Sequence, residues 1–338
     1  MKAPDLSTTR VALDLDLVSP GKRAGAARLR WSSNDNPLGH YPLPVMTVIG
    51  GEGPTVLLTG GVHGDEYEGP VALYRLYRAL DPVEVKGRLI ILPALNAPAL
   101  RAAARVSPLD GGNLNRAFPG RADGGPTEMI AHFVESCLMP VADAVIDLHA
   151  GGKASWFVPC ALAARAASGA LDPANLALAR AFGAPVVWVL GAQNDDRSVN
   201  AAATRAGLPA IAAELGGGGA RGPAERAVAE RGLRRVLAHL GVLSAPAVDD
   251  PLPPPRLVEL SAVNQSVTAE APGLYQPLVC AGDDVAAGNL LGLIHDIDLP
   301  DAAPLEVSAP CTGLVLAETR RGLVAPGDFL ALVASEVA

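Results

Sequence analysis

The sequence predicts an α/β protein, in which helices cover a sheet, followed by a small all-β domain. Three observations lead to this prediction: short apolar runs alternate with helical stretches, a proline-rich segment follows them, and one sequence phrase is repeated after that segment. The length of 338 residues suits one large and one small domain. Apolar residues make up 49% of the chain, so a large core can be buried.

The alternation of apolar and amphipathic segments defines the expected sheet and helices. Residues 1–50 alternate apolar and polar positions in short runs, which indicates hairpin-like strands. Later apolar runs suit strands buried on both faces, and they cover residues 55–59, 88–92, 144–148, 185–190 and 209–213. Helical stretches lie between them, for example at residues 69–80, 127–139 and 222–240.

A change of composition marks the domain boundary. Residues 244–255 read SAPAVDDPLPPP, and consecutive prolines favour an extended linker. We therefore expect a catalytic domain at residues 1–243 and a C-terminal β domain at residues 256–338.

The C-terminal domain contains an internal repeat. Residues 285–294 (VAAGNLLGLI) match residues 324–333 (VAPGDFLALV), which suggests two similar β half-units. The phrase resembles the one that closes each half of the biotinyl/lipoyl barrel-sandwich fold. That fold carries its cofactor on a lysine, and no lysine follows Lys153, so the resemblance implies the shape without the carrier role.

Charge and cysteine content restrict the partners and the compartment. The net charge is -8 with no basic stripe, which argues against nucleic acid and for a small molecule. The four cysteines are far apart and suggest buried free thiols in a reducing compartment. With no signal peptide or membrane span in the sequence, we expect a soluble, cytoplasmic protein, and a homo-oligomer is left open.

The segment GGVHGDEYEG contains the first candidate metal ligands. His63 and Glu66 lie three residues apart in a glycine-rich turn between an expected strand and a helix. Imidazole and carboxylate are natural zinc ligands, and α/β sheets place ligands where strands end. A surface histidine beside a solvated glutamate is the alternative reading of this pattern.

A second buried strand, AVIDLH, ends at His149, the third candidate ligand. Two histidines and one carboxylate leave a coordination position open for water, which is the pattern of a catalytic zinc site. Asp147 lies on the same side of the strand as His149, so it either orients a ligand or caps a nearby loop.

A third apolar strand closes with Glu214, and Leu215 and a run of four glycines follow. A carboxylate in such a place is unfavourable unless it is paired or functional. We assign Glu214 as the general base that takes a proton from a metal-activated water. A loop carboxylate without a role is the alternative.

The segment RVSPLDGGNLNRAFPG supplies the candidate substrate contacts. Asn115 and Arg116 can hold a carboxylate, because the guanidinium fork forms two hydrogen bonds with it. Arg105 could stabilise the developing oxyanion. Alternatively, residues 101–105 form an exposed helical face and Arg105 is solvated.

Together, GGVHGDEYEG, GGNLNRAFPG, DLHAGG and AELGGGG resemble the succinylglutamate desuccinylase/aspartoacylase family of the zinc carboxypeptidase-like clan, from about residue 40 to the end. The resemblance implies a mixed sheet flanked by helices and one Zn²⁺ ion per chain on His63, Glu66 and His149. It also implies Glu214 as catalytic glutamate, Asn115 and Arg116 as carboxylate ligands and Arg105 as oxyanion ligand.

The resemblance implies a zinc-dependent hydrolase that removes an acyl group from a small N-acylated amino acid. Within the family, HGDEYEGP and SPLDGGNLNRAFPG are most similar to deacetylases of N-acetyl-L-2,4-diaminobutyrate in ectoine breakdown. A deacylase of another amino acid, a zinc carboxypeptidase, a non-catalytic metal-binding protein and a scaffold that recruits a partner through its C-terminal domain remain alternatives.

Overall fold

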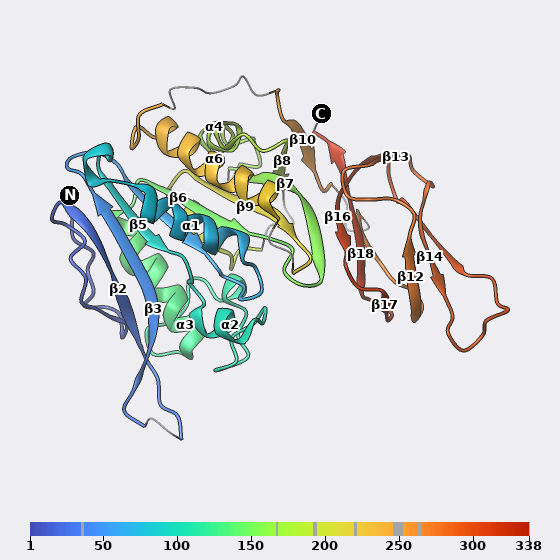
Figure 1. The fold of residues 1–338 in the computed structure, drawn as a ribbon, viewed down its shortest axis with the longest axis horizontal. Coiled ribbons are helices and arrows are strands. Elements are labelled where there is room, and N and C mark those ends of the chain that lie inside the picture. The colour runs from blue at the N-terminus through green and yellow to red at the C-terminus, as the bar shows by residue number, and fades with distance from the viewer. Residues whose placement is uncertain are drawn as a thin grey trace.

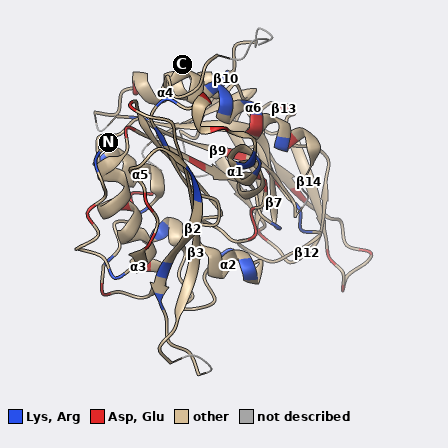
Figure 2. Ribbon diagram, turned by 60° about the vertical axis from the view of Figure 1, so that its left-hand side comes forward, with Lys and Arg blue, Asp and Glu red and all other residues tan. Residues whose placement is uncertain are grey.

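The computed structural model describes residues 1–34, 37–166, 168–191, 195–219, 222–245, 253–261 and 265–337. A long twisted sheet runs through the molecule, and the C-terminal strands lie at one end of it, on the right in Figure 1. Among the described residues, no helix is long and apolar enough to span a bilayer. Lys and Arg are interspersed with Asp and Glu over the elements in view in Figure 2.

The first nine strands form the main part of a 14-stranded sheet in the order β1-β2-β3-β5-β4-β6-β9-β7-β8. The sheet is mixed, because β5, β4, β6 and β9 are parallel whereas β7 is antiparallel to β9. The bounds are β1 Ala12–Leu13, β2 Gly21–Arg30, β3 His40–Ile49, β4 Thr55–Gly60, β5 Arg88–Leu92, β6 Ala144–His149, β7 Ser155–Ala164, β8 Val186–Leu190 and β9 Ala210–Gly217.

Helices cover both faces of this sheet. Helices α1, α4 and α6 pack on one face, and α2, α3 and α5 contribute to a second apolar core on the other. The bounds are α1 Glu68–Ala79, α2 Ala97–Ala102, α3 Pro126–His132, α4 Pro173–Phe182, α5 Val199–Arg205 and α6 Pro223–His239. A π-helical turn, Phe133–Leu138, continues α3. Buried cores on both faces explain why the central strands read as continuous apolar runs.

The expected α/β architecture is confirmed, with β2 and β3 as the N-terminal hairpin and β4, β5, β6, β8 and β9 at the predicted apolar runs. The prediction did not name β7, α4 or α5, and it placed helix at residues 101–105 where α2 covers Ala97–Ala102. It also ended the fifth apolar run at residue 213, whereas β9 continues to Gly217. Of the four free cysteines, Cys137 and Cys160 are buried as expected, but Cys280 is exposed because it lies in a turn after β12.

The C-terminal strands extend the long sheet and add a second, four-stranded sheet in the order β15-β14-β12-β17. Strand β10 joins the two parts of the chain, because it pairs with β8 on one side and β18 on the other. The bounds are β10 Arg256–Glu259, β11 Ser266–Thr268, β12 Gly273–Pro277, β13 Asp284–Val285, β14 Leu290–His295, β15 Leu305–Ser308, β16 Gly313–Thr319, β17 Leu323–Val324 and β18 Phe329–Glu336.

The two copies of the sequence repeat have matching local structure. Each has a short strand, a turn with a glycine at positive φ (81° at Gly288 and 87° at Gly327), and a longer strand. Val285 and Val324 open the two copies, and both are buried in the same C-terminal core. Of the predicted linker, residues 246–252 lie outside the described part of the chain.

Candidate metal centre and substrate cavity

His63 and Glu66 lie in the loop that connects β4 to α1. The loop folds tightly against α2, and the glycine between the two residues is required for this packing. A Cβ on Gly64 would lie 1.9 Å from the carbonyl carbon of Ala99. The close approach fixes the loop, and the side chains of His63 and Glu66 are buried where β4 ends.

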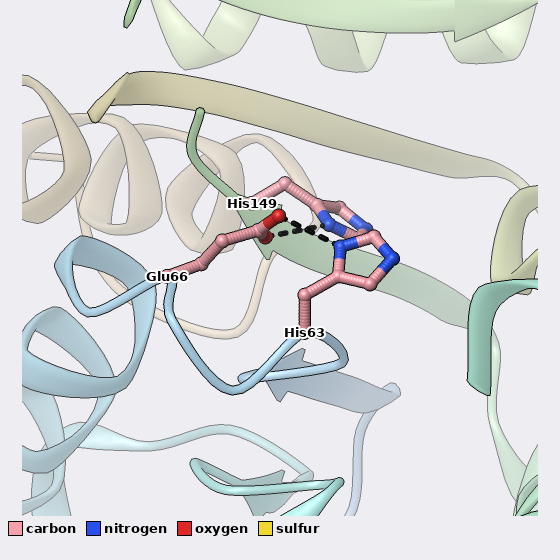
Figure 3. Close-up of side chains that lie close together, drawn as sticks. All are labelled: His63, Glu66 and His149. Atoms are coloured by element: carbon pink, nitrogen blue, oxygen red, sulfur yellow. Dashed lines mark hydrogen bonds and ion pairs between the residues drawn. The ribbon is translucent and has the colours of Figure 1, made fainter. Parts of the chain in front are cut away.

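The three predicted metal ligands converge on one point (Figure 3). Their ligand atoms all lie within 4.8 Å of one another. Nδ1 of His63 is 2.7 Å from one carboxylate oxygen of Glu66, and Nδ1 of His149 is 3.0 Å from the other. Two imidazoles and a carboxylate in this arrangement can hold a divalent cation such as zinc.

The outward ring nitrogens of both histidines also face oxygen atoms. Nε2 of His149 is 2.7 Å from Oδ2 of Asp147, whose other oxygen accepts a hydrogen bond from Thr59 at 2.7 Å. Nε2 of His63 is 3.2 Å from Oδ1 of Asn113. In the tautomer that carries the proton on Nε2, each imidazole donates a hydrogen bond from Nε2 to the oxygen it faces. The lone pair of Nδ1 is then directed at the point where the three candidate ligands converge.

Electrostatics in the site follow from this burial and pairing. Burial by itself raises the pKa of Glu66, but His149 and His63 more than offset it and hold that pKa far below its usual range. Burial lowers the pKa of His149, whereas Asp147 and Glu66 raise it well above its usual value. A metal cation would replace a proton between the histidines and Glu66, because the negative charge of the carboxylate attracts a cation and a proton alike.

Glu214 lies beside His149, since the two residues are paired in the parallel strands β6 and β9. Its Oε2 atom is buried and has no hydrogen-bond partner among the described residues. Burial and the charge of Glu66 raise its pKa to about 8, although His149 and Arg105 act in the opposite direction. Glu214 stands inside β9 rather than at its end, because the strand continues to Gly217.

Arg105 reaches the edge of the candidate metal centre. Its Nη1 atom is 3.5 Å from Oε1 of Glu66 and 3.4 Å from Nδ1 of His63. The reading of residues 101–105 as one helical face is wrong, because α2 ends at Ala102 and Ala103 adopts a left-handed conformation with φ 48°. The side chain is 53% exposed, so the guanidinium can contact both the site and a ligand.

Asn115 and Arg116 lie in a short 3₁₀ turn opposite the N-terminus of α5. Oδ1 of Asn115 accepts a hydrogen bond from the backbone N–H of Val199 at 3.0 Å. This bond fixes the amide at its oxygen end, and its NH₂ group can donate to a ligand. Nε of Arg116 is 2.9 Å from Oδ2 of Asp195. Both side chains therefore have one end fixed by the protein and retain free donors.

All seven predicted site residues line one cavity of about 530 Å³. A volume of this size is typical of small-molecule sites. Sequence reasoning did not find Asn113, Thr59 and Asp195, which contact His63, Asp147 and Arg116, respectively. Only Thr59 had a signal in the sequence, because it stands in an expected strand that could have been paired with Asp147.

Fold and site thus define a mixed α/β protein with a candidate divalent-metal centre inside a small-molecule cavity. Comparison with protein families then identifies the group. Residues 52–240 match the succinylglutamate desuccinylase/aspartoacylase catalytic domain. The chain belongs to this family and is a hydrolase that acts on an amide bond.

Individual relatives cover nearly the whole chain. The N-alpha-acetyl-L-2,4-diaminobutyric acid deacetylase of Halomonas elongata is 37% identical over 97% of this chain and 95% of its own length. A succinylglutamate desuccinylase structure from Silicibacter sp. TM1040 has a TM-score of 0.92 at 36% identity, covering 97% of this chain and 99% of that one. The product-bound ectoine utilization protein EutE (DoeB) of Ruegeria pomeroyi gives 0.92 at 37% identity with the same coverage.

Proposed function

We propose that this protein is a zinc-dependent deacetylase that hydrolyses the amide bond of N-acetyl-L-2,4-diaminobutyrate. The observation that carries the proposal is the position of Glu214, a carboxylate with a buried unpartnered oxygen beside three convergent metal ligands. The name of the Halomonas elongata relative supports the choice of substrate, since that protein is similar to this chain over nearly its whole length.

His63, Glu66 and His149 would hold one zinc ion. The donor set supports this assignment, because both imidazole Nδ1 atoms face the Glu66 carboxylate and both Nε2 atoms face oxygen atoms. Bound zinc would supply a positive charge that lowers the pKa of water and stabilises negative charge on the substrate oxygen.

Glu214 moves the proton in this mechanism. Its raised pKa in the metal-free site, about 8, would fall when a cation is nearby, so the carboxylate would be ionised and able to act as a base near neutral pH. It accepts the proton of the attacking water and returns it to the nitrogen of the leaving amine.

Arg105, Asn115 and Arg116 would position the substrate. Arg105 reaches the edge of the site with an exposed guanidinium, which can donate to the carbonyl oxygen as negative charge develops. The free donors of Asn115 and Arg116 would hold the amino-acid carboxylate and set the position of the amide bond relative to Glu214.

We further propose that residues 1–243 form the catalytic domain, residues 244–255 a linker and residues 256–338 a barrel-sandwich domain of the biotinyl/lipoyl shape. The matching halves of the repeat support the shape. This domain would have no carrier role, because it contains no lysine. Leu332 and Phe329 of β18 line the substrate cavity, which supports a part for the domain in shaping that cavity.

The test is amine release from N-acetyl-L-2,4-diaminobutyrate by zinc-loaded and chelator-treated protein in parallel. Turnover that is lost on chelation and restored by zinc supports the proposal. Tight binding of one zinc per chain without turnover would reject this substrate, and succinylglutamate, acetylaspartate and dipeptides would then be compared. Turnover that survives complete metal removal would reject the zinc mechanism.

A further inference from the structure

We infer that the cavity contains an apolar subsite beside Glu214, which binds a hydrocarbon group and lets the site accept N-acylated amino acids besides N-acetyl-L-2,4-diaminobutyrate. We call this region the apolar subsite and define it by Phe157, Leu162, Trp188, Leu260, Phe329 and Leu332. The inference extends the proposed function, because it concerns which N-acylated amino acids the same site accepts.

The register of the sheet shows where this subsite begins. His149 is paired with Glu214, and Glu214 with Cys160 of β7. Two pairs further along, and therefore on the same face, Ala212 lies opposite Leu162, and Leu162 opposite Trp188 of β8. Paired residues project from the same face, and neighbouring strands are about 4.8 Å apart. On the face of the sheet that bears His149 and Glu214, the side chains therefore become apolar from β9 to the neighbouring strand β7.

The C-terminal part of the chain also contributes to this lining. Phe329 and Leu332 of β18, with Leu260 after β10, line the same cavity as Leu162 and Trp188. The rings of Phe157 and Trp188 stack with their centroids 6.4 Å apart and their planes at 19°. Aromatic rings and several aliphatic side chains thus line the same cavity as His149 and Glu214.

Several of these side chains are only partly buried, which distinguishes the subsite from an ordinary core. Leu162 and Leu332 are 7% exposed and belong to one apolar cluster. Phe157, Trp188 and Phe329 pack against that cluster but stay only partly buried, because their remaining surface faces the cavity. An apolar group placed there would remove this surface from water, which favours binding in proportion to the area covered.

Two parts of an N-acylated amino acid could supply such a hydrocarbon group. One is an acyl chain longer than acetyl, and the other is the side chain of an aliphatic or aromatic amino acid. Both are hydrocarbon groups, which is what the apolar subsite would bind. The polar end of the cavity, with Asn115 and Arg116, would hold the carboxylate in either case.

The experiment measures binding of compounds that cannot be hydrolysed, by titration calorimetry with the intact zinc-loaded protein. One series is acetate, butyrate and hexanoate, and the other is alanine, leucine and phenylalanine. Burying a methylene group strengthens binding about three- to fourfold. We expect at least a tenfold gain from the first to the last member of one series, and the series that shows it identifies the source of the hydrocarbon group.

Variants locate the effect. Trp188→Gln removes the apolar ring and places there a polar side chain that tolerates partial exposure. The gain in affinity along the ligand series should therefore fall to threefold or less. Leu323→Gln is the matched control, because Leu323 is an exposed leucine of β17 that does not line the cavity. A gain that is equal in the wild-type protein and in Trp188→Gln would overturn the inference.

The same preparation is assayed with N-acetyl-L-2,4-diaminobutyrate, so the two proposals can fail separately. Turnover together with less than a twofold change along both series would reject the apolar subsite and keep the proposed function. A tenfold gain without turnover would reject the proposed substrate and support the apolar subsite.

Discussion

His149 Nε2 lies 2.7 Å from Asp147 Oδ2, and the two residues project from the same face of β6. Thr59 of the neighbouring strand β4 donates to the other carboxylate oxygen of Asp147. The imidazole is therefore held by a carboxylate that is itself fixed, and its Nδ1 atom is kept facing Glu66. A histidine oriented in this way is a better metal ligand than one that rotates freely, because less conformational freedom is lost on binding.

The first prediction concerns this contact. Asp147→Asn keeps the shape of the side chain but removes its negative charge, so zinc affinity should fall about 10- to 100-fold. Competition with a chromophoric chelator measures the change. Asp143→Asn is the control, because Asp143 precedes the same strand and accepts the backbone N–H of Thr55, away from the site. Equal zinc affinity in the wild type and in Asp147→Asn would show that Asp147 does not support the metal centre.

The second prediction concerns Glu214 in the reaction. Glu214→Gln removes the proton acceptor and should lower kcat about 10²- to 10⁴-fold, as expected for loss of general base catalysis. The zinc content should remain at one per chain, because Glu214 is outside the set of three convergent ligands. Steady-state kinetics and metal analysis on one preparation separate these effects. A variant that retains more than a tenth of kcat would assign the base to another group.

A third prediction uses the raised pKa of Glu214, about 8 against an ordinary value of 4.5. Between these pH values the unfolded chain has released the proton that the folded metal-free protein still binds. The contribution of this group to stability is therefore fully present below pH 4.5 and is lost as the pH rises to about 8. Metal-free wild type should lose stability relative to metal-free Glu214→Gln over this range.

Urea unfolding of the two metal-free proteins at pH 5, 6.5 and 8 measures this difference. The wild type should fall progressively further below the variant, and saturating zinc should shrink the gap, because a nearby cation favours the carboxylate. Stability curves that stay parallel across the range would contradict the raised pKa.

The sequence was sufficient to predict that the three candidate metal ligands converge, but not to predict their surroundings. His63, His149 and Glu214 follow or stand in parallel strands, whose carboxyl ends meet at one edge of the sheet, so their convergence follows from the apolar pattern. Asn113 and Asp195 contact the site only through the packing of loops, which leaves no periodic signal.

Strand β7 shows a different reason for failure. It contains Pro159, and a proline argues against a strand inside a sheet. The structure accommodates Pro159 through a register shift between Phe157 and Cys160, where β7 bulges away from β9. The apolar subsite was missed together with β7, since Phe157 and Leu162 are both part of that strand.

The fourth prediction concerns Arg88, which is 1% exposed and whose guanidinium bonds to no carboxylate among the described residues. It donates to the carbonyl oxygens of Lys2, Leu17 and Val141 and to the hydroxyl of Thr55. Arg88→Met would leave these buried acceptors without a donor and should destabilise the fold by about 2–4 kcal/mol.

Urea unfolding measures the loss, and the N-terminal segment should become sensitive to limited proteolysis because two of the lost bonds hold it. Arg28→Met is the control, since Arg28 is exposed and pairs with exposed Asp14, so the change should be within about 0.5 kcal/mol. A similar small effect at Arg88 would mean that water replaces the lost donors.

The fifth prediction concerns how Arg116 is held. Oδ2 of Asp195 lies 2.9 Å from Nε of Arg116 and pairs with it. The Asp195 carboxylate is itself fixed by hydrogen bonds from Nε and Nη2 of Arg197. The hydrogen bonds from Arg197 lower the pKa of Asp195 to about 2, so it stays ionised throughout the neutral range. Asp195→Asn would weaken this hold, and Arg116 would bind the substrate carboxylate from several orientations.

We expect Asp195→Asn to raise KM about tenfold with little change in kcat, because the carboxylate is bound equally in the ground and transition states. The preference for a substrate carboxylate over the corresponding carboxamide should fall by a similar factor, which a general loss of stability would not cause. Glu135→Gln is the control, since Glu135 pairs with Arg205 at the other end of α5. An unchanged carboxylate preference would show that Arg116 is positioned without Asp195.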